Sequence, residues 1–179
     1  MQEEELWRLC KDGDKNARKL LYELFAPTLF SIAMRYLGER ELAQDILHDC
    51  FIKLFASLGK FTWRGAGSLK AWMCRVMVNM SIEHLRKNKK IIVDISYAEN
   101  KYEEPEAELI NDIPETILLK FISELPYGYR TVFNLFIFEE KSHKEIAELL
   151  KINEKSSASQ LVRAKAALAK RIKEYKEKK

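Results

Sequence analysis

Apolar residues recur at three- and four-residue steps along most of this 179-residue chain, whereas alternating β-branched runs are few. The segment 39–58 shows this best, with apolar residues at Ala43, Ile46, Leu47, Cys50, Phe51, Leu54, Phe55 and Leu58. That spacing follows the turn of an α-helix and not the two-residue period of a strand. The chain has no internal repeat, and its length suits two small bundles. We therefore predict an all-α fold with two small helical domains.

Glycine, proline and capping residues divide the chain into predicted helices. In the first half we expect them at about 3–11, 15–37, 39–58 and 69–89, with an interruption at Pro27 and a C-cap at Gly38. In the second half we expect them near 114–123, 129–138, 142–150 and 154–174. Ser142 and Glu145 form a capping box, and Lys151–Asn153 is a three-residue break. The last two helices therefore have the spacing of a helix-turn-helix.

Charge is segregated along the chain, although the net charge is only +4. Residues 1–59 carry −2, residues 60–90 carry +7, residues 91–126 carry −7 and residues 127–179 carry +6. Blocks of lysine and arginine are typical of proteins that neutralise nucleic-acid phosphates, although solvated helix faces would also explain each block alone. We predict domains at 1–90 and 113–179, joined by a flexible acidic linker at 91–112.

Several classes of protein are disfavoured. Cys10, Cys50 and Cys74 are scattered and never paired as CxxC, so we expect buried thiols and neither a disulfide framework nor a metal site. The chain lacks an 18-residue apolar span and begins with the acidic Glu3-Glu4-Glu5, so we expect a cytoplasmic protein without membrane insertion. It shows no phosphate-cradling glycine loop and no nucleophile elbow, so we expect no catalytic residues, no cofactor and no enzyme.

The second helix of the helix-turn-helix must turn an apolar face inward and a polar face toward DNA. Leu161, Ala164, Leu168 and Ile172 would face the bundle. The predicted outer side carries Lys155, Ser156, Ser159, Gln160, Arg163 and Lys170. Hydroxyl, amide and guanidinium groups suit base edges and phosphates.

The first basic block combines cations with aromatic rings. Its helix carries a polar stripe of Arg75, Asn79 and Arg86, and the preceding loop contains Lys60, Phe61, Trp63 and Arg64. Rings that stack on unpaired bases and cations that follow phosphates suit single-stranded nucleic acid. Core packing is the alternative for these rings: we favour it for Trp72 and leave both interpretations open for Trp63.

Several runs resemble the extracytoplasmic-function group of bacterial RNA polymerase sigma factors. RYLGERELAQDILHDCFIKL at 35–54 resembles region two, and LKAWM at 69–73, followed by Asn79 and Arg86-Lys87, is similar to the helix after it. Leu125-Pro126, RTVF at 130–133, KEIA at 144–147 and QLVRA at 160–164 resemble region four. The resemblance covers nearly the whole chain except the linker.

The resemblance implies a sigma factor that binds core RNA polymerase and directs it to promoters. Polymerase would dock on the exposed side of the second conserved helix, at Asp45, His48, Asp49 and Lys53. Region two would melt the minus-ten element through Lys60, Phe61, Trp63, Arg64, Arg75, Asn79 and Arg86. Region four would read the minus-thirty-five element through Lys155, Ser156, Ser159, Gln160 and Arg163. The group also implies an anti-sigma partner.

Three positions depart from the pattern of the group. Lys151 replaces the usual glycine of the turn, Ser157 replaces an apolar residue, and Ala158 replaces a common lysine. A helix-turn-helix regulator that does not bind polymerase is the alternative function. It would need only the C-terminal motif, so the N-terminal half favours the sigma factor.

Overall fold

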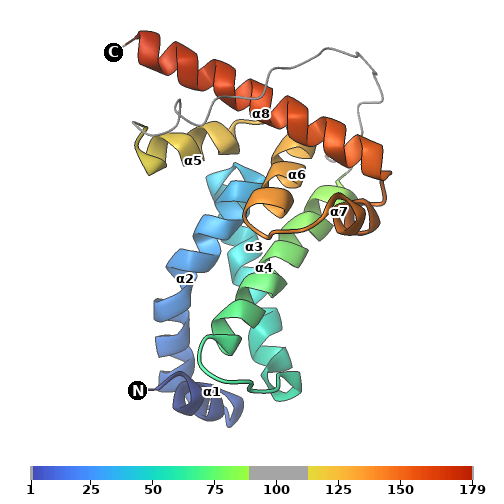
Figure 1. Cartoon of the computed structure of the whole chain (residues 1–179). Coiled ribbons are helices and arrows are strands. Elements are labelled where there is room, and N and C mark those ends of the chain that lie inside the picture. The colour runs from blue at the N-terminus through green and yellow to red at the C-terminus, as the bar shows by residue number, and fades with distance from the viewer. Residues whose placement is uncertain (1, 89–112, 179) are drawn as a thin grey trace. The chain divides into compact units, whose positions relative to one another are not determined.

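The structure, a computed structural model, describes residues 2–88 and 113–178. In the first part the helices are α1 (Glu3–Lys11), α2 (Lys15–Leu37), α3 (Arg40–Ser57), the 3₁₀ turn η1 (Leu58–Lys60) and α4 (Ser68–Lys87) (Figure 1). In the second part they are α5 (Glu115–Ser123), α6 (Tyr127–Ile137), α7 (His143–Leu150) and α8 (Glu154–Glu177). All regular structure in the described residues is helical, so the predicted all-α fold is confirmed.

The chain divides into two compact units, Met1–Glu83 and His84–Lys179. The boundary falls inside α4, just before its last turn. The predicted acidic linker at 91–112 lies outside the described residues.

In the first unit, α2 packs against both α1 and α3. Asp14 caps the start of α2 by accepting a hydrogen bond from the Ala17 N–H at 2.7 Å, and Gly38 ends it in the left-handed conformation at φ 73°. The interruption predicted at Pro27 is wrong, because α2 continues through it. Pro27 is exposed, so the carbonyl that lacks its proline N–H partner can bond to water instead.

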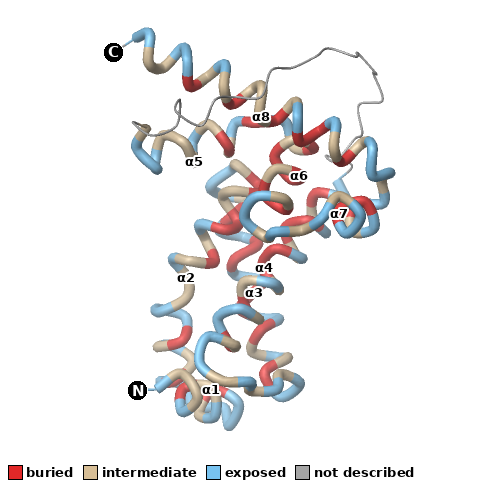
Figure 2. Tube along the Cα trace, viewed as in Figure 1, coloured by how far each residue is buried: buried red, intermediate tan, exposed pale blue. Residues whose placement is uncertain are grey.

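The apolar stripe predicted for residues 39–58 forms the buried side of α3. Seven of its eight residues are buried, and Phe55 is half-buried. Figure 2 shows buried residues recurring along α3 and along its neighbours α2 and α4. Packing one side of α3 inward leaves its polar side on the surface, and this orientation positions the first candidate site.

In the second unit, α8 packs against α5, α6 and α7. A core of Ile122, Leu125, Ala164 and Leu168 joins α5 and α8. The capping box predicted at α7 is present: Ser142 accepts from the Glu145 N–H, and Glu145 accepts from the Ser142 N–H at 2.8 Å. The Ser142 N–H and hydroxyl both donate to the Glu145 carboxylate, and these two bonds hold the pKa of Glu145 below its usual value. In the described part of the chain, no helix is long and apolar enough to cross a membrane.

Lys151 ends α7 in the left-handed conformation, at φ 58° and ψ 44°. Its N–H donates to the Ala147 carbonyl, so the strained backbone closes the helix and turns the chain toward α8. A left-handed residue with a Cβ costs roughly 1–2 kcal/mol, which exceeds the entropy that glycine loses on folding, roughly 0.5–1 kcal/mol.

We therefore expect Lys151→Gly to stabilise the α7–α8 pair by about 0.5–1 kcal/mol. Hydrogen exchange of the α7 amides in the full chain measures this. Glu148→Gly is the control, since it places glycine in an exposed turn inside α7 and should destabilise by about 1 kcal/mol. Faster exchange in Lys151→Gly would show that the lysine makes contacts that outweigh its backbone strain.

Candidate nucleic-acid interface

The outer face of α3 forms a surface that we call the α3 ridge. Asp45, His48, Asp49 and Lys53 are all exposed, as predicted. The structure adds Ile52, whose exposed fraction is 57% although it is a large apolar residue. At about 100° per residue it lies between His48 and Asp45 on this face. An apolar centre with charges around it is typical of a protein-binding surface.

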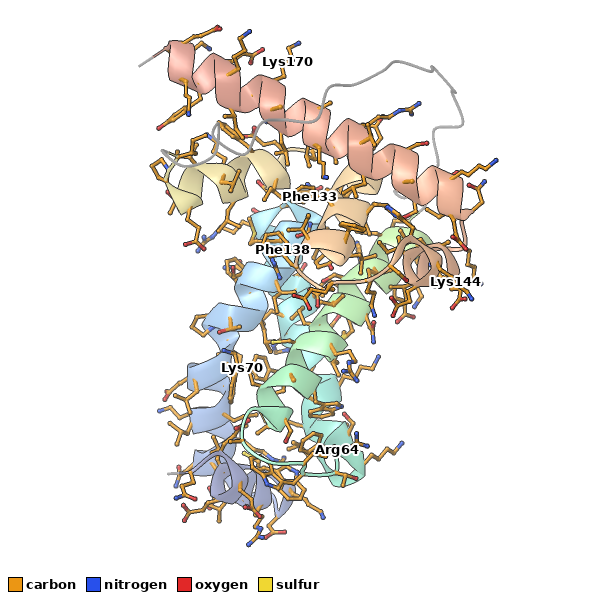
Figure 3. The ribbon with its side chains drawn as sticks, in the orientation of Figure 1. Arg64, Lys70, Phe133, Phe138, Lys144 and Lys170 are labelled. Atoms are coloured by element: carbon orange, nitrogen blue, oxygen red, sulfur yellow. The ribbon has the colours of Figure 1, made fainter. Side chains whose placement is uncertain are left out.

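A hollow of about 350 Å³ opens beside the start of α4. Its lining comes from η1, the loop 61–67 and the first two turns of α4: Lys60, Phe61, Thr62, Arg64, Ser68, Ala71, Trp72 and Arg75. We call it the loop pocket. Four residues predicted to contact the minus-ten element, namely Lys60, Phe61, Arg64 and Arg75, therefore meet in one place, and Arg64 is labelled in Figure 3.

Aromatic rings form one wall of the loop pocket. The Phe61 and Trp72 ring centroids are 5.0 Å apart, and both side chains are half-buried, so their surfaces are partly open to the pocket. Trp72 is therefore only partly a core residue, because the rest of its side chain lines the pocket. Trp63 instead stacks on Trp7 of α1 at 6.1 Å and 16°, so Trp7 covers one face of its ring.

The loop pocket depends on two glycines for its shape. Gly65 and Gly67 have φ values of 109° and 81°, which residues with a Cβ rarely adopt. An added Cβ would meet no atom within 4 Å at either position, so the requirement is conformational and not one of space. On α4 the predicted polar stripe of Arg75, Asn79 and Arg86 is exposed.

The outer face of α8 agrees with the helix-turn-helix prediction in most positions. Lys155, Ser159 and Lys170 are exposed, while Ser156 and Arg163 are half-buried, and Figure 3 labels Lys170. Leu161, Ala164, Leu168 and Ile172 are buried as predicted. Val162, which the prediction omitted, is 40% exposed, and its methyl groups suit contact with a thymine methyl.

The surface position predicted for Gln160 is wrong. Its exposed fraction is 5%, and neither amide atom has a hydrogen-bond partner among the described residues. Gln160 lies three residues after Ser157 and four before Ala164, and both of these are buried. Their shared side of α8 faces the bundle, so Gln160 cannot reach a base edge without a change in conformation.

Ser157 explains one departure from the pattern of the group. It is fully buried, and its Oγ lies 2.9 Å from Nδ1 of His143 at the start of α7. The His143 ring also stacks on Phe136 of α6, with centroids 4.8 Å apart. His143 thus gives the buried Ser157 hydroxyl a hydrogen-bond partner, at a position where the group usually has an apolar residue. The same contact connects α7 to α8.

Two of the three cysteines, Cys10 and Cys50, are buried. Burial raises the pKa of Cys10 to about 11 and that of Cys50 to about 12, so neither thiol is ionised near neutral pH. Over residues 2–88 and 113–178, no group of three or more histidine, cysteine, aspartate or glutamate side chains could hold a metal ion.

Both halves of the chain match known protein families. Residues 21–91 match the Sigma-70 region 2 family, and residues 115–168 match the Sigma-70, region 4 family. The RNA polymerase sigma-H factor of Pseudomonas aeruginosa is 26% identical, over 96% of this chain and 94% of its own. The ECF RNA polymerase sigma factor SigM of Bacillus subtilis is 26% identical, over 83% of this chain and 90% of its own. The RNA polymerase sigma factor SigV of the same organism is 30% identical, over 75% of this chain and 78% of its own. The chain belongs to the extracytoplasmic-function group of RNA polymerase sigma factors, which direct transcription initiation.

Proposed function

We propose that residues 1–90 bind core RNA polymerase and a melted promoter strand, and that residues 113–179 read duplex DNA upstream. The observation that carries this proposal is the loop pocket, because it gathers three cations and two half-buried rings in an open hollow. A duplex presents stacked bases that rings cannot reach, whereas an unpaired base can enter such a hollow and stack. The pocket is therefore suited to the minus-ten element after melting.

The α3 ridge is the proposed docking surface for polymerase. Asp45 and Asp49 supply negative charge that can steer a basic partner, and Ile52 supplies apolar area that binding would bury. His48 and Lys53 lie at its edges. The ridge and the loop pocket use different residues, so polymerase and the melted strand can be bound at the same time.

The helix-turn-helix of α7 and α8 is the proposed reader of the minus-thirty-five element. Lys155, Ser156, Ser159, Val162 and Arg163 form the set that we propose to contact it, and Gln160 is omitted because it is buried. Asn153 caps α8 by accepting from the Ser156 N–H at 2.6 Å. This cap places the first turn of α8 firmly, and that turn carries the groups nearest the groove in such motifs.

Reconstitution tests the proposal directly. The purified chain is mixed with bacterial core polymerase and a library of promoter sequences, and the transcripts are sequenced. We expect initiation at a defined subset that shares upstream and downstream elements. A chain that binds duplex DNA but neither associates with core polymerase nor starts transcripts would instead be a helix-turn-helix regulator.

Arg163→Ala should weaken binding of the reconstituted holoenzyme to the upstream element by about 1–3 kcal/mol. The reason is the loss of a guanidinium that can hold a guanine edge or a phosphate. Competition binding against a panel of upstream sequences separates the two, since a base contact relaxes specificity at one position and a phosphate contact weakens all sequences alike. Lys120→Ala, at an exposed position of α5, is the control and should bind normally. Unchanged affinity in Arg163→Ala would remove it from the interface.

A further inference from the structure

Glu3 of α1 makes hydrogen bonds to a part of the chain more than 60 residues away. Its Oε2 accepts from the Gly67 N–H at 2.6 Å, and its Oε1 accepts from the Lys70 N–H at 3.1 Å. These two amides belong to the start of α4, where Gly67 accepts the first backbone bond of the helix, from Ala71. A helix usually obtains such a cap from its own N-cap side chain, which Gly67 lacks.

The same helix also holds the other end of the loop. The Trp7 ring lies 5.8 Å from the Phe61 ring and 6.1 Å from the Trp63 ring. Within the described residues the Trp7 indole N–H has no hydrogen-bond partner, so Trp7 contributes ring packing. Glu3 and Trp7 are four residues apart and share one face of α1. The loop 61–67 is thus held at both ends by one helix.

We propose that Glu3 is a positioning residue for the loop pocket, which it shapes without touching the strand. By capping α4 it fixes Gly67 and the first turn, which carries Ser68 and leads to Ala71, Trp72 and Arg75 of the lining. The Ser68 hydroxyl donates to the Gly65 carbonyl at 2.6 Å, so fixing Ser68 also fixes the end of the loop. A site held in its bound shape loses less entropy on binding. This inference rests on the proposed role of the pocket in holding a melted strand.

The proposal predicts the opposite sign from simple electrostatics. Removing a carboxylate beside a cationic pocket should strengthen binding of a polyanion if charge alone mattered. If Glu3 positions the pocket, Glu3→Ala and Glu3→Gln should weaken binding despite the more positive charge. The amide of Gln is nearly isosteric, but it puts an N–H donor where one carboxylate oxygen accepts. Glu5→Ala is the matched control, because Glu5 lies in the same first turn, carries the same charge and is exposed.

The experiment uses the full chain reconstituted with core polymerase and a promoter fork whose minus-ten strand is already unpaired. We expect Glu3→Ala and Glu3→Gln to lose on the order of tenfold in affinity for the fork, with unchanged affinity for core polymerase. The salt dependence should also stay unchanged, because no phosphate contact is removed. Hydrogen exchange at Gly67 and Lys70 should speed up while exchange in α3 does not.

Three results would overturn the inference. Fork binding as tight as wild type, or tighter, would show that the cap does not shape the pocket. Parallel loss of core affinity would show a general role in folding. An equal loss in Glu5→Ala would trace the effect to α1 in general and not to the cap that Glu3 gives α4. A wild-type holoenzyme that does not bind the fork would instead contradict the proposed function, so the two failures are distinguishable.

Discussion

Replacing Asp45 and Asp49 together by arginine should lower the affinity for core RNA polymerase by about two to three orders of magnitude. Both carboxylates are exposed on the α3 ridge, so the reversal changes the surface and leaves the buried stripe of α3 untouched. The proposed partner surface is basic, so arginines on the ridge would place like charges against each other, which costs several kcal/mol. Titration of labelled core polymerase with the variant measures the loss directly.

A charge-matched control and the salt dependence separate a specific docking surface from a general effect of net charge. Asp12→Arg with Glu23→Arg makes the same charge change at exposed positions outside α3, and it should bind core polymerase normally. The defect at the ridge should shrink as salt is raised, because the screening length falls from about 10 Å at 0.1 M to about 3 Å at 1 M. Normal association of the Asp45 and Asp49 variant would move the docking surface away from α3.

Ile52 shows why the ridge was only partly predictable from the sequence. Periodicity identified the buried side of α3, and that settled which polar residues are outside. An isoleucine on the polar side adds nothing to the periodic signal, since isolated apolar residues are common on protein surfaces. Its position between His48 and Asp45 becomes meaningful only once the exposed face of α3 is known.

Local signals predicted the helix ends well, and long-range contacts account for most of what was missed. Gly38 and the Ser142 capping box act through neighbours within four residues, so the sequence displays them. The cap of α4 comes from Glu3, which no local pattern connects to Gly67. The loop pocket was missed for the same reason, because its walls are the loop 61–67 and the start of α4, and both are held by contacts with α1.

Gln160 marks the limit of helical-wheel reasoning. Its side chain lies at the edge between the buried and exposed sides of α8, where a few degrees decide its burial. A polar side chain there is expected on the surface, yet Gln160 is buried on a helix that packs against α6 and α7. Ser157 shows the same effect, with the difference that His143 satisfies its hydroxyl.

Replacing Arg64 and Arg75 together by alanine should weaken binding of the unpaired minus-ten strand by about ten- to a hundredfold at low salt. Both arginines line the loop pocket and are exposed, so removing them takes cations from the surface and leaves the buried core unchanged. For single strands, each phosphate neutralised contributes about 0.7 to the slope of log affinity against log salt. The two arginines should therefore account for about 1.4 of the measured slope, if each holds one phosphate.

The slope separates phosphate contacts from every other role of these arginines. Anisotropy titrations of a labelled strand with holoenzyme at several salt concentrations give affinity and slope in one experiment. Lys15→Ala with Lys19→Ala removes the same charge from exposed positions of α2, and it should leave the slope unchanged. A fall in affinity with an unchanged slope would mean that the arginines stack on bases or support the loop, because only lost phosphate contacts release fewer counterions. An unchanged affinity would place the melted strand elsewhere, since a cationic pocket that held it must lose binding energy with its cations.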